Sequence, residues 1–250
     1  MISKRVASKE SIAIRLNPEI DRLEVSRSLA TSGRVHIKLA IDPASADQIS
    51  QYLLKDALWN TIFNEHEEIS HSLSKMQMSL LSTAQRNTLY SFLRKRARST
   101  FTYIYQTSDL QYCNEESSHG QSVAKQIHEF FNGKEFLSFV REISGISTLS
   151  EAETQATQFK KNHFITRHTD VGAEYHGRRM AFVLSLTREW RAEWGGILEF
   201  LDENGNVTEG FTPSFNSLNL FYVPVLHHVS CVSHISQGKR ISISGWLRDP

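Results

Sequence analysis

The residues best suited to bind a metal ion lie in the second half of the chain. His168 and Asp170 flank a single threonine, and residues two apart in an extended segment point to the same side. If this segment is extended, an imidazole and a carboxylate face one site and can act as two ligands of a metal ion. The pair alone does not define a site, because such triplets also occur by chance, so a third ligand is needed.

The adjacent histidines His227 and His228 supply the candidate third ligand. Neighbouring residues of a strand face opposite sides, so only one of the two can join His168 and Asp170. Two imidazoles and one carboxylate form the facial triad that binds non-haem Fe(II) and leaves coordination positions open for dioxygen and a co-substrate. The alternative is a pair of strand histidines with a purely structural role.

A residue suited to bind a carboxylate follows further along the chain. Arg240 and Ser242 occupy alternate positions of an expected strand and share one face, whereas the intervening Ile241 faces the other side. The planar guanidinium matches a carboxylate through two hydrogen bonds. The polar face therefore predicts a site for a dicarboxylate, and the alternative is an arginine at a strand end that faces solvent.

The elements that would position these residues are short strands. Four segments have a β-like composition: residues 181–186, 197–201, 218–223 and 241–246. The Asp-Glu-Asn-Gly-Asn sequence at residues 202–206 predicts a hairpin turn, because asparagine and glycine accept positive φ. Strands broken by glycine, proline and asparagine, without helices between them, indicate an antiparallel sandwich or jelly roll.

The first half of the chain combines helices with a few strands. Alternating apolar residues at 35–41 predict a strand, and helices are expected over residues 45–56, 82–98 and 121–143. We therefore expect one domain over residues 1–250. Within it, residues 1–147 would form a helix-rich support with a few strands, and residues 148–250 the catalytic jelly-roll core.

Composition narrows the class of protein. The formal net charge of +1 gives no general reason to expect a nucleic acid or an acidic membrane as partner. No apolar run approaches the roughly 20 residues of a membrane span, and the N-terminus lacks the apolar stretch of a signal peptide, so a cytoplasmic protein is expected. Cys113 and Cys231 are too few for a disulfide framework and are not spaced as a metal-binding pair.

Taken in order, the motifs resemble those of the 2-oxoglutarate- and Fe(II)-dependent oxygenase superfamily, and within it the prolyl-hydroxylase-like branch. The resemblance covers about residues 155–247. It is carried by these motifs: His168-Thr169-Asp170, Gly195-Gly196, Pro213 with Asn216, His227-His228-Val229-Ser230-Cys231-Val232, and Arg240 before Ile243-Ser244-Gly245-Trp246. The register of the valines identifies His227, rather than His228, as the metal ligand.

This resemblance implies a mainly β core with helices: a double-stranded β-helix, or jelly roll, packed against N-terminal helices. It implies Fe(II) bound by His168, Asp170 and His227, with 2-oxoglutarate and O2 as co-substrates. Arg240, with Ser242 beside it, would bind the distal carboxylate of 2-oxoglutarate.

One stretch departs from the pattern of the branch. Phe159 replaces a tyrosine that commonly helps to hold 2-oxoglutarate, and Asn162 stands where a glycine is usual. A phenyl ring cannot donate a hydrogen bond. We therefore expect 2-oxoglutarate binding either to depend more heavily on Arg240 and Ser242 or to use another donor, such as Tyr175 or Tyr222.

The activity implied is hydroxylation of an unactivated C–H bond, with a prolyl residue of a protein or peptide as the expected target. Asp170 favours hydroxylation over halogenation, because related halogenases replace this carboxylate with a small residue. A nucleic-acid demethylase of the superfamily would carry a second arginine at the position of Trp246. The alternatives are a hydroxylase of a free amino acid or metabolite, and a non-catalytic jelly-roll module that binds metal. Arg178, Arg179, Tyr175 and Trp246 are candidates for lining the substrate pocket.

Overall fold

The computed structural model describes residues 13–67, 69–111, 119–170 and 177–250, and only the backbone of residues 119–122. The helices in this part of the chain are α1 (Arg22–Ser32), α2 (Pro43–Lys55), α3 (Lys75–Leu80), α4 (Thr83–Arg96), α5 (His119–Phe131), α6 (Lys134–Ser144) and the short η1 (Ala192–Trp194). The strands are β1 (Arg34–Lys38), β2 (Asn60–Asn64), β3 (Ser70–Ser74), β4 (Tyr103–Asp109), β5 (Glu151–Phe159), β6 (Phe164–His168), β7 (Arg178–Leu186), β8 (Leu198–Leu201), β9 (Val207–Phe211), β10 (Phe215–Tyr222), β11 (His227–Val229) and β12 (Arg240–Arg248).

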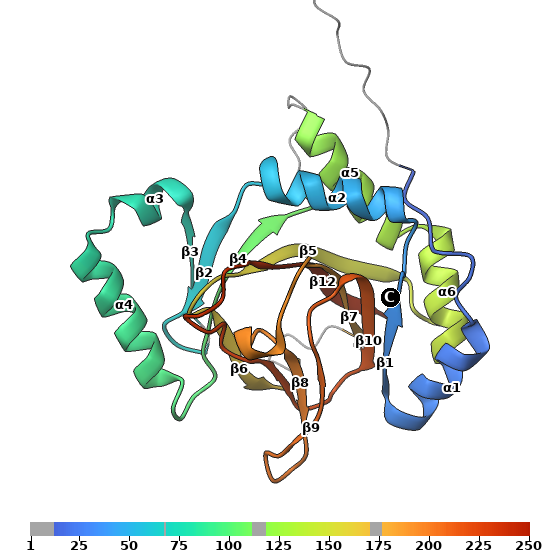
Figure 1. Ribbon diagram of the computed structural model, residues 1–250. Helices are drawn as coiled ribbons and strands as arrows, with labels where there is room; N and C mark the ends of the chain where they lie inside the picture. The colour runs from blue at the N-terminus through green and yellow to red at the C-terminus, as the bar shows by residue number, and fades with distance from the viewer. Residues whose placement is uncertain (1–12, 68, 112–118, 171–176) are drawn as a thin grey trace, which may run out of the picture.

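The strands form one continuous sheet that curls into a barrel-like shape (Figure 1). Their order is β1-β10-β7-β12-β5-β4-β6-β11-β8-β9, and β2 and β3 extend the sheet from β4. Paired strands run antiparallel along this path. In Figure 1 the wall that contains β1, β10, β7, β12 and β5 faces the wall that contains β6, β8 and β9, and β11 pairs between β6 and β8 in that second wall. This arrangement confirms the expected antiparallel jelly roll.

The main hydrophobic core lies between the helices and the larger wall. Helices α1, α2, α5 and α6 contribute buried residues to it, and β1, β7, β10 and β12 contribute the opposing ones. Phe131 of α5 stacks on Phe182 of β7 with ring centroids 4.6 Å apart, and Phe136 of α6 packs edge-on against Phe131. Burial of each large apolar side chain stabilises the fold by about 1.5–3 kcal/mol, so this layer holds β7 and β12 in place.

Local sequence sets the beginnings of two expected helices. Asp42 caps α2 through its side chain, and Pro43 occupies the first turn, where no backbone N–H is needed. Ser82 and Gln85 form a reciprocal capping box at the start of α4. Both helices predicted from the sequence in these two regions are therefore confirmed.

The helix expected over residues 121–143 is in fact two helices, α5 and α6, separated at Asn132 and Gly133. The Asn132 side chain accepts a hydrogen bond from the backbone N–H of Ala152 and donates one to its carbonyl, which ties the break to β5. Apolar residues keep helical spacing across the break, which is why the pattern predicts a single helix. That expectation is wrong.

The first strand is shorter than the alternation at residues 35–41 predicts. β1 ends at Lys38, because Leu39 adopts a positive φ of 50° and turns the chain. The buried Asn216 side chain then holds the turn through hydrogen bonds with the backbone N–H and carbonyl of Ile41. Asn216 thus links the start of β10 to the segment between β1 and α2.

Strand β4 joins the barrel although it comes from the first half of the chain. It pairs with β2, β5 and β6, so that it stands directly beside β5 in the sheet. The β2–β3 hairpin continues outward from β4, and α3 and α4 extend beyond it at the side of the molecule (Figure 1).

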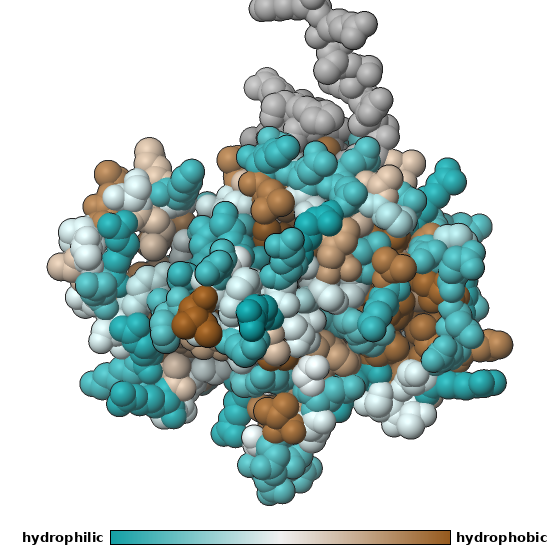
Figure 2. Space-filling view, viewed as in Figure 1, coloured by the Kyte–Doolittle hydropathy of each residue, from teal (hydrophilic) through white to brown (hydrophobic). Residues whose placement is uncertain are grey.

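The surface on the viewed side is mostly hydrophilic (Figure 2), and hydrophobic residues gather beside α1 and α6. Within the ranges described above, no helix has both the length and the apolar character that crossing a membrane would require.

Candidate metal centre and carboxylate pocket

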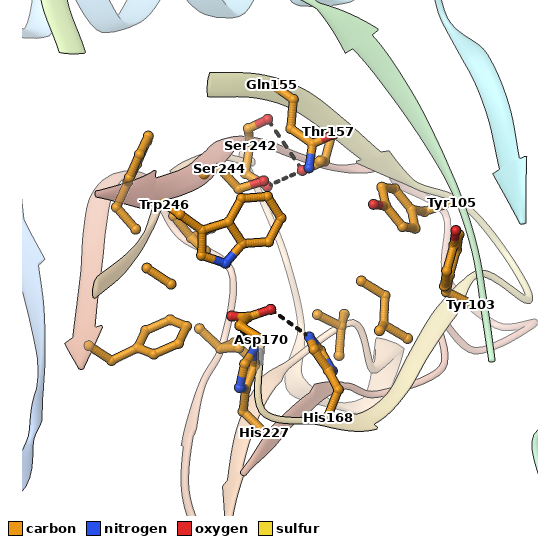
Figure 3. Close-up of a pocket in the computed structure, with 18 of the residues that line it drawn as sticks. Tyr103, Tyr105, Gln155, Thr157, His168, Asp170, His227, Ser242, Ser244 and Trp246 are labelled. Carbon is orange, nitrogen blue, oxygen red and sulfur yellow. Dashed lines mark hydrogen bonds and ion pairs between the residues drawn. The ribbon is translucent and has the colours of Figure 1, made fainter. Parts of the chain in front are cut away.

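A cavity of about 860 Å³ opens inside the barrel. Side chains of metal-binding type gather at one end of it, and Arg240 lies elsewhere on its wall. Figure 3 shows Tyr103 and Tyr105 along one side of the cavity, with Trp246 above Asp170. The cavity therefore brings acidic, basic, imidazole and aromatic side chains together around one space that opens to solvent.

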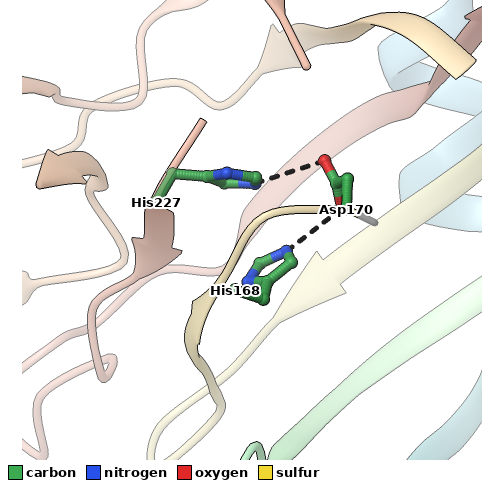
Figure 4. Close-up of side chains that lie close together, drawn as sticks. All are labelled: His168, Asp170 and His227. Carbon is green, nitrogen blue, oxygen red and sulfur yellow. Dashed lines mark ion pairs between the residues drawn. The ribbon is translucent and has the colours of Figure 1, made fainter. Parts of the chain in front are cut away.

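His168, Asp170 and His227 converge at one end of this cavity (Figure 4). One ligand atom from each residue lies within 4.8 Å of the other two. His168 Nε2 is 3.2 Å from Asp170 Oδ1, and His227 Nε2 is 3.4 Å from Asp170 Oδ2. Their side chains are 19%, 7% and 6% exposed, so the cluster is shielded from bulk water.

Pairing between β6 and β11 brings the two histidines together. His227 lies opposite His168 in the register of these strands. Asp170 lies beyond the end of β6 and adopts a positive φ of 61°, a conformation that aspartate tolerates better than most residues. The carboxylate thus reaches the histidines through a turn, and not through the strand alternation that the extended reading of residues 168–170 assumes.

Backbone carbonyls orient both imidazoles. His168 Nδ1 lies 3.0 Å from the oxygen of Thr166, and His227 Nδ1 lies 2.9 Å from the oxygen of Val225. A carbonyl oxygen only accepts, which assigns the proton to each Nδ1 and leaves each Nε2 with a lone pair directed toward Asp170. Two imidazole lone pairs and a carboxylate repel one another unless a cation lies between them. This donor set fits Fe(II) bound by a facial triad.

Burial sets the protonation of the cluster. Burial, assisted by the proximity of His168, lowers the pKa of His227 to about 4. Burial by itself would raise the pKa of Asp170, but its interactions with His168 and His227 outweigh burial and lower that pKa. At neutral pH Asp170 is therefore a carboxylate and His227 a neutral imidazole, which are the forms that bind metal.

His228 points away from this cluster. Its Nε2 lies 2.6 Å from the carboxylate of Glu199, on the neighbouring strand β8. The structure thus brings His227, and not its neighbour, beside His168 and Asp170.

Arg240 places a guanidinium on the cavity wall. The residue is 4% exposed, and its guanidinium carbon lies 4.8 Å from the centroid of the Phe159 ring. Within the described ranges, no acidic side chain forms an ion pair with it. Burial lowers the pKa of Arg240 to about 10, so the group stays charged at neutral pH. A buried cation without a counter-ion is costly, which makes this part of the cavity complementary to an anion.

Ser242 lies on the same face of β12 as Arg240 and also lines the cavity. Its hydroxyl is 2.9 Å from the hydroxyl of Thr157 on β5, and both side chains are buried. Each hydroxyl both donates and accepts, so this pair can offer a donor to a ligand beside Arg240.

Tyr222, one of the two tyrosines named from the sequence, does not line the cavity. Tyr222 donates a hydrogen bond of 2.9 Å to a backbone carbonyl at the end of α6, and Tyr175, like Cys113, lies outside the described residues. Tyr103 and Tyr105 of β4 line the cavity instead. Their alternation with Ile104 and Gln106 is the strand signal in the sequence that could have identified them.

Two of the residues proposed for a substrate pocket lie on the cavity wall, namely Arg178 and Trp246. The guanidinium carbon of Arg178 is 3.7 Å from the indole centroid of Trp246, and Arg178 also pairs with Glu153 at 2.9 Å. Arg179 instead pairs with Asp249 at 2.7 Å, with 44% of its side chain exposed. Among the candidates that the structure describes, the stacked pair of Arg178 and Trp246 lines the cavity, and Tyr175 lies outside the described residues.

The Gly195-Gly196 motif holds the chain close to the strand that carries His227. A Cβ atom on Gly195 would lie 2.1 Å from the carbonyl oxygen of Cys231, and its φ of 66° and ψ of −151° suit glycine alone. Gly196 donates a backbone hydrogen bond of 3.0 Å to the carbonyl of Ser230. The two glycines thus help to position the segment that follows His227, and they do not contact His168, Asp170 or His227 themselves.

A model of a known protein family matches the part of the chain that carries the sequence motifs described above. A family model described as the 2OG-Fe(II) oxygenase superfamily matches residues 154–248, a region that contains the His168, Asp170 and His227 cluster together with Arg240.

Two curated proteins show similarity beyond this region. The chain is 26% identical to prolyl 3-hydroxylase OGFOD1 of Mus musculus over 194 residues, which cover 75% of this chain and 32% of that protein. It is 32% identical to the protein of the same name from Xenopus laevis over 150 residues, which cover 57% of this chain and 27% of that protein. The chain spans about a third of the length of the curated relatives it matches.

Solved structures share the fold. An oxidoreductase of the 2OG-Fe(II) oxygenase family from Burkholderia pseudomallei superposes with a TM-score of 0.61 at 14% identity, over 94% of this chain and 93% of that one. A Pseudomonas putida prolyl-4-hydroxylase superposes with a TM-score of 0.55 at 16% identity, over 92% of this chain and 99% of that one. At these sequence identities the structural similarity shows that the chain shares the jelly-roll fold of these proteins.

Proposed function

Because the chain belongs to the 2-oxoglutarate- and Fe(II)-dependent oxygenase superfamily and is prolyl-hydroxylase-like, we propose that it is a dioxygenase that hydroxylates an unactivated C–H bond. The cofactor of this superfamily is Fe(II), and its co-substrates are 2-oxoglutarate and O2. The proposed target is a prolyl residue of a protein or peptide.

The proposed metal ligands are His168, Asp170 and His227. Their convergence within 4.8 Å and the orientation of both imidazoles by backbone carbonyls support this assignment. Bound Fe(II) would supply the centre at which O2 and 2-oxoglutarate are converted into an oxidant for a C–H bond. The contribution of the protein is to hold the three ligands in their metal-binding protonation states and to keep water away from them.

The proposed contact for the distal carboxylate of 2-oxoglutarate is Arg240, with Ser242 beside it. The single observation that carries the functional proposal is this buried guanidinium, which lacks an acidic partner in the described part of the chain and shares one cavity with the metal-binding cluster. A dicarboxylate can bind the metal ion through one end and pair with the Arg240 guanidinium through the carboxylate at its other end. Burial of the cluster and of Arg240 strengthens these interactions, because charges attract more strongly away from water.

We propose that the whole of residues 1–250 folds as one domain, in which residues 1–147 support the jelly-roll core of residues 148–250. The insertion of β4 beside β5 in the sheet supports a single unit. The core nevertheless depends on its support, since Tyr103 and Tyr105 belong to the first half and line the cavity.

The experiment that tests the proposed function measures the incorporation of oxygen from O2 into a product. The iron-loaded protein is incubated with a proteome digest and a metabolite extract, with and without 2-oxoglutarate, under oxygen-18 gas. The expected result is a peptide that gains one labelled oxygen atom on a proline only when 2-oxoglutarate is present. Asp170→Ala serves as the inactive control.

Two other outcomes contradict parts of the proposal. A labelled free metabolite without a labelled peptide refutes the prolyl target and leaves the chemistry intact. The absence of any labelled product and of any 2-oxoglutarate consumption indicates a binding module instead of an enzyme.

A further inference from the structure

Three side chains form one row across the wall of the cavity. β5 lies between β12 and β4, and Arg240 of β12 is paired in register with Phe159 of β5. Tyr105 of β4 stacks on the Phe159 ring with centroids 5.1 Å apart and an interplanar angle of 9°. The phenyl ring therefore stands between the guanidinium of Arg240 and the phenol of Tyr105.

The hydroxyl of Tyr105 belongs to the cavity. Figure 3 shows it directed toward the interior, where it forms a hydrogen bond with the Gln155 side chain. Gln155 Oε1 already accepts from Thr107, so the Gln155 amide is the donor and the hydroxyl hydrogen of Tyr105 remains available for a ligand. Tyr103, its neighbour on the same face of β4, differs: it donates its hydroxyl hydrogen to the Ser70 side chain at 2.9 Å, at the rim. Of these two cavity-lining phenols, Tyr105 is the one that faces the ligand space.

Tyr105 also lies on the path from the arginine to the metal-binding cluster. The charge of Asp170 is close enough to affect the phenol, and a chain of aromatic contacts leads from His168 through Phe101 and Tyr103 to Tyr105. Tyr105, Arg240 and the three residues of the cluster all line the same cavity. Between Arg240 and Tyr105, the row presents only the ring carbons of Phe159, which cannot donate a hydrogen bond.

We propose that the Tyr105 hydroxyl donates a hydrogen bond to a carboxylate of the 2-oxoglutarate that Arg240 binds. The inference rests on the proposed function, because it takes 2-oxoglutarate as the occupant of the cavity. A carboxylate has about four acceptor positions and a guanidinium fork fills two of them, so further donors stabilise the bound anion. Tyr105 supplies the hydroxyl that Phe159 cannot, from the adjacent strand.

The environment of Tyr105 keeps its hydroxyl protonated, so that it can donate a hydrogen bond. Burial, with a smaller effect from the neighbouring Tyr103, raises the pKa of Tyr105 well above its usual value. The hydroxyl consequently keeps its hydrogen at any pH at which the protein would work, and its donation to an anion is insensitive to pH.

Direct binding tests the proposal without turnover. We would titrate 2-oxoglutarate into the Mn(II)-loaded protein in the absence of O2 and compare wild type, Tyr105→Phe and Tyr103→Phe by calorimetry. Tyr105→Phe keeps the ring stack and removes only the hydroxyl. A hydrogen bond to a charged acceptor predicts that its dissociation constant rises about tenfold or more, whereas Tyr103→Phe stays within about twofold of wild type. The near-ultraviolet difference spectrum on 2-oxoglutarate binding should carry a tyrosine signal that Tyr105→Phe removes.

Failure of this inference is distinguishable from failure of the proposed function. If Tyr105→Phe binds 2-oxoglutarate as wild type does while Arg240→Ala does not, the role of Tyr105 is refuted and the proposed function stands. If the wild-type protein loaded with Mn(II) does not bind 2-oxoglutarate, both are refuted.

Discussion

His168 and His227 face each other across one register pair of β6 and β11, and their ring centroids lie 4.2 Å apart. Each Nδ1 is held by a backbone carbonyl two residues earlier in the chain, so both Nε2 atoms point toward Asp170. Residues far apart in the sequence therefore meet because two strands pair in one register. A shift of one residue would exchange His227 for His228.

The first prediction separates these two histidines. His227→Ala should abolish binding of Fe(II) or Mn(II), because it removes one of three ligands, whereas His228→Ala should retain it. Metal binding is measured by calorimetry under anaerobic conditions, and circular dichroism checks the fold of both variants. His228→Ala still loses its contact with Glu199, so it controls for a lost strand histidine. Normal metal affinity in His227→Ala would mean that the cluster is not the metal site.

The second prediction concerns Arg240. Arg240→Ala should weaken 2-oxoglutarate binding by about 2–5 kcal/mol, because a buried bidentate ion pair is lost. Arg240→Lys should restore only part of the affinity, since an ammonium lacks the planar fork. The two variants are compared with wild type by titration of the metal-loaded protein. Unchanged affinity in Arg240→Ala would remove this residue from the site.

The third prediction follows from a buried histidine outside the metal cluster. Burial, assisted by the charge of Lys160, lowers the pKa of His163 to about 4, against about 6.5 in the unfolded chain. Between pH 6.5 and 4 the unfolded state binds more protons, so stability is full at neutral pH and is lost as the pH falls through this window. His163 should account for about 2 kcal/mol of the loss in unfolding free energy between pH 7 and pH 5.

Urea unfolding at both pH values checks this expectation. His163→Asn should show a smaller loss of stability between pH 7 and pH 5 than wild type does. His234→Asn, which changes an exposed histidine, should behave like wild type. An identical pH dependence in wild type and His163→Asn would contradict the account.

The fourth prediction compares two glycines with positive φ. In Gly195→Ala the new Cβ would meet the carbonyl of Cys231, so we expect a loss of at least about 3 kcal/mol together with weaker metal binding. Gly205→Ala, in the turn between β8 and β9, meets no atom within 4 Å and should cost only about 1–2 kcal/mol. Chemical unfolding measures both. Equal losses would show that the close approach at Gly195 is unimportant.

The sequence was most informative where chemistry depends on short motifs. The alternation of Arg240 and Ser242 on one face follows from strand geometry, whereas the choice of His227 over His228 follows from the register of the valines in the motif that the chain shares with the oxygenases. Jelly-roll architecture followed from the ordered motifs and the short strands. These features are local, and a single segment carries each signal.

Features that depend on pairing between distant segments were harder to predict. Tyr105 reaches the cavity only because β4 pairs with β5, and nothing within residues 103–109 specifies that partner. Asp170 reaches the histidines through a turn at positive φ, which strand alternation does not reveal. Similarly, the break between α5 and α6 is fixed by hydrogen bonds from Asn132 to β5, and not by its own helical pattern.

Succinate release is the most direct test of the central claim. The purified protein is supplied with Fe(II), O2, 2-oxoglutarate and a proteome digest, and succinate is quantified beside a His168→Ala control. The account predicts succinate that depends on iron and 2-oxoglutarate, that increases with the digest, and that His168→Ala does not produce. Iron binding and 2-oxoglutarate binding without any succinate would contradict it and leave a metal-binding module.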